Sequence, residues 1–139
     1  MAAQYKGITI KFGADTTTIS KSMKSIDDEA RQLKSNLNTV NKSLKFDSDN
    51  PELLAQKFTI LNEQIVNTKN RLAQLVEYEK RAKVLFESGD ISKSQYTSLT
   101  REIEKAKTEL KGLNNEAKAS FDNLKTSILG AKEKLSEFT

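Results

Sequence analysis

The 139-residue chain contains no histidine, no cysteine, no tryptophan and a single proline. Without imidazole and thiol side chains it lacks the commonest general acid–base group and the most reactive protein nucleophile. A Cys/His zinc site and a disulfide are excluded for the same reason. We therefore expect no enzymatic activity, no cofactor and no metal site. No apolar run approaches the roughly 20 residues that span a bilayer, and the first residues do not read as a secretory signal.

The chain is rich in charge of both signs. Charged residues make up 30% of it, and 23 Lys and Arg stand against 19 Asp and Glu, a net charge of +4. The signs are interspersed, as where Lys105, Lys107 and Lys111 occur among Glu102, Glu104 and Glu109. This pattern is typical of a solvated helix face. We expect no specific nucleic-acid binding and no membrane association of this segment, and weak nucleic-acid binding remains an alternative.

One short segment near the N-terminus has the period of a strand. Residues 7–12 alternate apolar and polar side chains, so that Ile8, Ile10 and Phe12 would line one face. We assign residues 1–15 to an N-terminal strand segment. A single strand has unpaired backbone groups on both edges. It would have to pair with another copy, a partner or further sequence, and a frayed extended tail is the alternative.

Three heptad patterns follow and predict long helices over residues 16–46, 51–88 and 92–138. Apolar residues recur at alternating spacings of three and four, which indicates a narrow seam between helices. The coiled-coil seam consists of Ile19, Met23, Ile26, Leu33, Leu37, Val40 and Leu44, then Leu54, Phe58, Leu61, Ile65, Leu72 and Leu75, then Tyr96, Leu99, Ile103, Leu110 and Leu113.

Two places interrupt these seams. Late in the second helix a strict heptad places Glu79 in the seam, whereas a three-residue slip places Tyr78 there. We favour the slip, because an unpaired carboxylate in an apolar seam is costly. In the third helix two consecutive steps of four lead through Ala117 to Phe121. This stutter, together with Gly112, predicts a bend or break between residues 112 and 121.

The turns between the helices carry capping residues. Asn50 suits the N-cap of the second helix, and Gly89 suits the left-handed position that ends it. Ser92 and Gln95 form a capping box for the third helix. Because both turns are short, consecutive helices should pack antiparallel, which would bring Phe86 beside Tyr96.

The predicted fold is therefore mainly α. It is one elongated module of three long helices, an antiparallel helical hairpin or coiled-coil bundle, preceded by one short β-strand. Each seam covers only about two positions in seven and buries little surface in a monomer, so we expect a homo-oligomer.

Three stretches of the chain, at residues 6–17, 37–47 and 86–103, resemble the N-terminal region of the tail tape measure proteins of tailed bacteriophages and prophages. The resemblance covers about residues 5–118, and the three stretches occur in the same order as in that family. The chain departs from the family at Ser48, where many relatives carry proline, and in length. Tape measure proteins are much longer, with apolar membrane-active stretches and sometimes enzyme domains downstream.

The resemblance implies a structural ruler or scaffold component of the phage tail. Tape measure proteins are extended and mostly helical, run inside the tail tube as several copies, and set the length of the tail. The implied partners are tail tube and tail assembly chaperone proteins. The implied location is the lumen of the virion tail tube, with the host cytoplasm during assembly. A generic coiled-coil adaptor and a membrane-active helical hairpin are the alternative functions.

Overall fold

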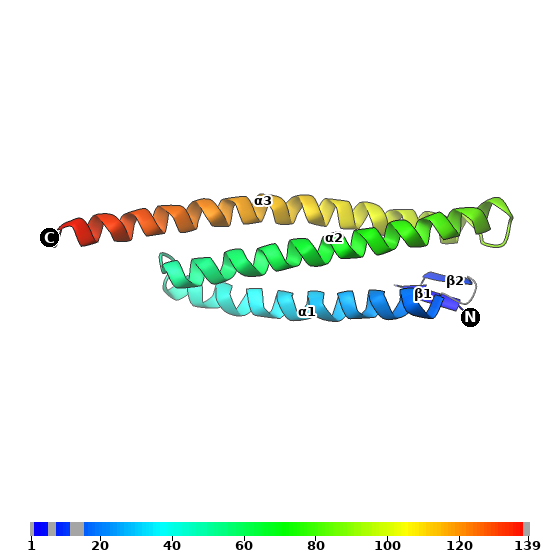
Figure 1. Ribbon diagram of the computed structural model, residues 1–139, viewed down its shortest axis with the longest axis horizontal. Coiled ribbons are helices and arrows are strands. Elements are labelled where there is room, and N and C mark those ends of the chain that lie inside the picture. The colour runs from blue at the N-terminus through cyan, green and yellow to red at the C-terminus, as the bar shows by residue number, and fades with distance from the viewer. Residues whose placement is uncertain (1, 6–7, 12–15, 138–139) are drawn as a thin grey trace. The chain divides into compact units, whose positions relative to one another are not determined.

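The described part of the chain is mainly helical and contains three long helices (Figure 1). The computed structural model describes residues 2–5, 8–11 and 16–137, and the side chains of residues 23–130, 132 and 133. The elements in chain order are β1 (Ala2–Tyr5), β2 (Ile8–Lys11), α1 (Thr16–Phe46), α2 (Pro51–Glu87) and α3 (Lys93–Glu137).

The N-terminal segment differs from the sequence prediction of one strand without a partner in the chain. β1 and β2 pair antiparallel, with Ala2 opposite Lys11 and Tyr5 opposite Ile8. Pairing within the chain occupies the backbone groups along the shared edge, which a lone strand could not do. Phe12 lies outside the described residues, and the side chains of Ile8 and Ile10 lie outside the described side chains.

The first turn begins α2 as its sequence predicts. Asn50 Oδ1 accepts hydrogen bonds from the backbone N–H groups of Glu52 and Leu53, at 2.9 and 3.1 Å. Pro51 has no N–H and takes the first helical position, where none is needed. The carboxylate of Asp47 accepts the Asn50 side-chain amide at 3.0 Å, so it belongs to this capping turn.

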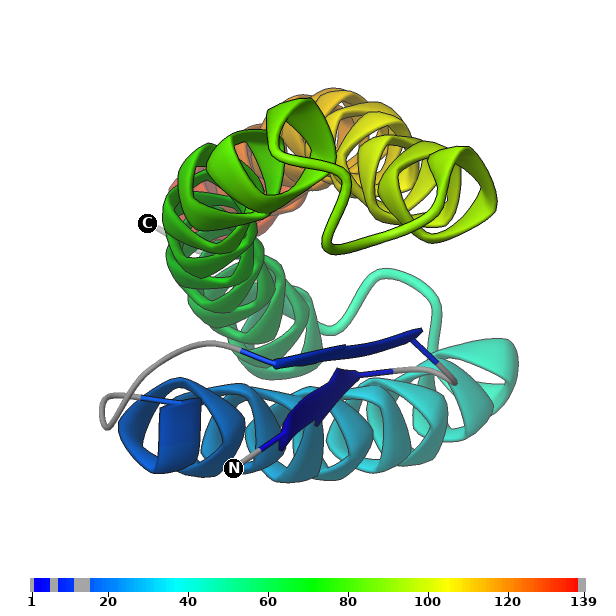
Figure 2. The same cartoon turned by 90° about the vertical axis from the view of Figure 1, so that its right-hand side faces the viewer.

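The second turn, seen end-on in Figure 2, ends α2 in a Schellman motif. Gly89 has a φ of +83°, and its N–H donates to the Phe86 carbonyl at 3.1 Å. The N–H of Asp90 donates to the Leu85 carbonyl at 2.8 Å. Both bonds satisfy carbonyls that the end of a helix would otherwise leave unpaired. The positive φ confirms the predicted role of Gly89.

The capping box that begins α3 is also confirmed. Ser92 Oγ accepts from the Gln95 N–H at 3.1 Å, and Gln95 Oε1 accepts from the Ser92 N–H at 2.9 Å. Ile91, just before the cap, is buried and Tyr96 packs against the same cluster, as expected for a hydrophobic staple.

The chain divides into two compact units, each with stretches of all three helices. The first unit comprises Met1–Ala30 and Asn67–Leu110. Its core consists of Met23, Leu75, Tyr78, Ala82, Ile91, Leu99, Ile103 and Ala106. Tyr78 is only 3% exposed, which confirms the predicted three-residue slip in the α2 seam.

The second unit comprises Arg31–Val66 and Lys111–Thr139. Its buried apolar side chains are Leu33, Val40, Leu54, Leu61, Ile65 and Ala117. The rings of Phe58 on α2 and Phe121 on α3 meet with centroids 5.4 Å apart. This contact fits antiparallel packing of α2 and α3.

The predicted break in α3 is wrong, and so is the stutter through Phe121. α3 runs without interruption from Lys93 to Glu137. Ser120 is buried and Leu124 and Ser127 are half-buried, whereas Phe121 is 48% exposed. Spacings of three and four from Ala117 through these residues keep a regular seam, so no change of helix phase is needed. The cost of one helical glycine, about 1 kcal/mol, is small beside the packing of so long a helix.

Gly112 is a helical position where alanine should stabilise the chain. A Cβ built there meets nothing within 4 Å. Alanine restricts the unfolded chain, so Gly112→Ala should raise the free energy of unfolding by about 0.5–1 kcal/mol. Urea unfolding followed by circular dichroism measures the change.

Gly89→Ala is the matched control. It should lower the free energy of unfolding by about 1 kcal/mol, because Gly89 has a positive φ. Equal effects of the two substitutions would contradict the assignment of Gly112 to an ordinary helical turn.

Candidate functional site

Among the described residues, no group of three or more His, Cys, Asp and Glu side chains could hold a metal ion. Within the described helices, none has the length and apolar character that crossing a bilayer requires. The buried polar side chains on α2 lie instead within a little more than one turn, at Asn67, Thr68 and Arg71. We call these three residues the polar layer.

Arg71 joins α2 to both other helices within the first unit. It is only 8% exposed. One guanidinium nitrogen lies 3.3 Å from a carboxylate oxygen of Asp27 on α1, and another lies 3.3 Å from one of Glu109 on α3. A buried cation without such partners would be strongly destabilising. The α1 and α3 carboxylates must therefore lie at the height of Arg71.

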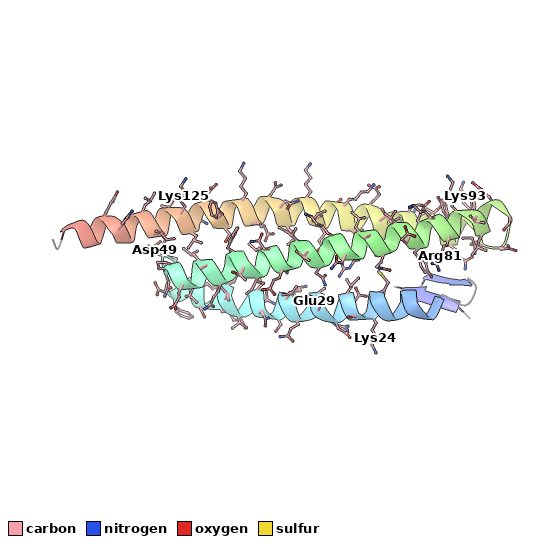
Figure 3. All side chains as sticks on the ribbon, in the orientation of Figure 1. Lys24, Glu29, Asp49, Arg81, Lys93 and Lys125 are labelled. Atoms are coloured by element: carbon pink, nitrogen blue, oxygen red, sulfur yellow. The ribbon has the colours of Figure 1, made fainter. Side chains whose placement is uncertain are left out.

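Asn67 adds a second connection to α1. Its side-chain amide donates to the Ile26 carbonyl at 2.9 Å and to the Glu29 carboxylate at 3.3 Å. Glu29 is labelled in Figure 3. Asn67 and the neighbouring Thr68 are almost fully buried. Since heptad seams repeat every seven residues, a polar contact at one height distinguishes the observed register from one shifted by a heptad.

A second polar contact lies near the α2–α3 turn. The Tyr96 hydroxyl donates a hydrogen bond to the Glu79 carboxylate, and the Tyr96 ring stacks on Phe86 with centroids 5.0 Å apart. The stacking confirms the predicted neighbours across the turn. The hydrogen bond to Glu79 raises the pKa of Tyr96, and burial and the negative charges of Glu79 and Glu87 raise it further.

Most of the predicted seam side chains are covered by the chain itself. Nine are buried: Met23, Leu33, Val40, Leu54, Leu61, Ile65, Leu75, Leu99 and Ile103. Eight are half-buried: Ile26, Leu37, Leu44, Phe58, Leu72, Tyr96, Leu110 and Leu113. The side chain of Ile19 lies outside the described side chains. The prediction missed the burial of Arg71 and Asn67, which flank the seam and carry no signal at heptad spacing.

Stability should respond unequally to removal of the buried Arg71 cation and to removal of its two carboxylate partners. Replacing Asp27 and Glu109 together by Asn and Gln leaves Arg71 buried without a counter-charge, which should cost about 3 kcal/mol. Arg71→Met should cost clearly less, because the two carboxylates are partly exposed and solvent can reach them. Chemical denaturation of the variants gives both values.

Glu104→Gln provides the control for a surface ion pair. Glu104 lies 3.4 Å from Lys107, and both side chains are exposed. Its replacement should change stability by less than about 0.5 kcal/mol. A larger loss for Arg71→Met than for the double carboxylate variant would contradict the proposed energetics of the layer.

Stability should fall more steeply at alkaline pH in the wild-type chain than in Tyr96→Phe. A raised pKa in the folded state stabilises the chain below the pKa of the unfolded state, about 10, and this contribution is lost as pH rises through the folded-state pKa. The difference in unfolding free energy between the two proteins should therefore shrink above pH 10. Denaturant titrations at neutral and alkaline pH measure it; a constant difference would exclude the linkage.

The chain was compared with protein-family models, curated proteins and solved structures. No protein-family model matches the chain, and neither a curated protein nor a solved structure does.

Proposed function

We propose that the chain is a structural segment of a tail tape measure protein, a ruler or scaffold that sets tail length and supports assembly of the tail tube. The observation that carries the proposal is the polar layer within continuous heptad seams. Long helices convert residue number into distance at about 1.5 Å per residue. Such a device needs a defined register, which the contacts of Arg71 and Asn67 supply.

The described side chains support a scaffold role in a second way. Buried groups on α2 contact other helices, and no cluster that could bind a metal accompanies them among the described residues. The resemblance of residues 5–118 to tape measure proteins supplies the biological setting. The resemblance also implies that the partners are tail tube and tail assembly chaperone proteins, and that the segment lies in the lumen of the tail tube.

Self-association is part of this proposal. Several apolar side chains outside the seams remain exposed, notably Phe46, Val66 and Val84. Exposed apolar side chains favour further protein contacts where they gather. The N-terminal strand segment offers additional backbone groups for pairing with another chain.

Tail length tests the ruler proposal directly. In the phage or prophage that encodes the chain, residues 16–137 are deleted in frame and tails are measured by electron microscopy. If the segment lies in the tail as a single extended helix, tails should shorten by about 180 Å; if its helices stay folded back, shortening should not exceed the length of α3, about 70 Å. Loss of tails would support the scaffold role.

Synonymous recoding of the same residues is the control and should leave tail length unchanged. Mass spectrometry of purified virions checks whether peptides of the segment are present. Normal tails in the deletion strain, together with absence of the peptides from wild-type virions, would overturn the proposal and favour a generic helical adaptor.

A further inference from the structure

On the C-terminal part of α3, large apolar side chains beside the α2-facing seam remain about half exposed, although the Phe121 ring packs against Phe58 on α2. In the second unit, Phe121, Ile128 and Leu129 are 48%, 50% and 53% exposed. Large apolar side chains this exposed mark an interaction surface when they gather on one face. Phe121 and Ile128 are seven residues apart and therefore lie on one side of the helix.

Lysines alternate with these apolar residues. Lys118, Lys125 and Lys132 are exposed, and together with Phe121 and Ile128 they follow spacings of three and four along α3. Lys125 lies on the outer side of α3 in Figure 3. We call this set of five residues the α3 stripe. No ion pair involves its lysines within the part of the chain whose side chains are described.

The charge of the stripe decides what can cover it. A second copy in parallel register would bring Lys125 against Lys125 and Lys132 against Lys132, and like charges at such close range are unfavourable. An antiparallel copy would set lysines against Phe121 and Ile128, which supplies no counter-charge. The acidic residues of α3 beyond Lys118 are Asp122, Glu133 and Glu137, and all three lie off the heptad positions of the stripe.

We propose that the α3 stripe docks an amphipathic helix of another protein in which apolar and acidic residues alternate at heptad spacing. The apolar side chains of that helix would cover Phe121 and Ile128. Its carboxylates would pair with Lys118, Lys125 and Lys132. This charge complementarity gives specificity as well as faster association. The inference rests on the second unit alone and does not depend on the tape measure proposal.

A pair of synthetic helical peptides tests the docking. The first has heptads with alternating Leu and Glu at its seam positions, and the second replaces each of these Glu residues by Lys. Fluorescence anisotropy should show the chain binding the Glu peptide at least about tenfold more tightly than the Lys peptide. Added salt should reduce the preference.

Charge reversal provides the decisive variant. Replacing Lys118, Lys125 and Lys132 by Glu should invert the preference, so that the Lys peptide binds more tightly. The matched control replaces Lys105, Lys107 and Lys111 by Glu, which changes the net charge equally on the same helix and should leave the preference as in wild type. Circular dichroism verifies that each variant remains helical.

Three outcomes would overturn the inference. The first is a preference that the stripe variant does not invert, or that the control variant inverts as well. The second is lysine-dependent binding to vesicles of phosphatidylcholine and phosphatidylglycerol without binding to the Glu peptide, which would assign the stripe to a membrane surface. The third is self-association, measured by light scattering, that disappears in Ile128→Ser, which would assign it to a second copy.

Discussion

The guanidinium of Arg71 is a buried cation held between carboxylates from two other helices. Apolar contacts supply the attraction between the helices, but they repeat along each seam and distinguish poorly between registers. A buried charge does distinguish the registers. Sliding one helix by a heptad would move the Arg71 guanidinium about 10 Å away from Asp27 or Glu109. The polar layer thus selects one arrangement among several that the seams alone would allow.

Local signals in the sequence were sufficient for both ends of α2 and for the start of α3. The Asn50 cap, the Schellman motif at Gly89 and the capping box at Ser92 each depend on residues within a few positions of one another. The slip that places Tyr78 in the α2 seam was also predictable, because the alternative would put the carboxylate of Glu79 there. In the structure that carboxylate instead accepts the Tyr96 hydroxyl.

The residue type at a single position was a less reliable guide to which side chains of α3 are buried. Phe121 appeared to continue the α3 seam because it is apolar, yet Ser120 is the residue that is buried. Helix phase is a property of the whole segment, and a long helix tolerates a serine inside its seam more easily than a break in its backbone hydrogen bonds. The same phase leaves Phe121 and Ile128 beside the lysines of the α3 stripe.

The sequence by itself determined that the chain forms long helices, and where α2 ends and α3 begins. These properties follow from heptad spacing and capping residues, which act over short stretches of chain. Only the tertiary structure decided which polar residues are buried and which apolar residues remain uncovered. Asn67 binds a carbonyl 41 residues away, and no local pattern specifies which residue of a distant helix will lie at its height.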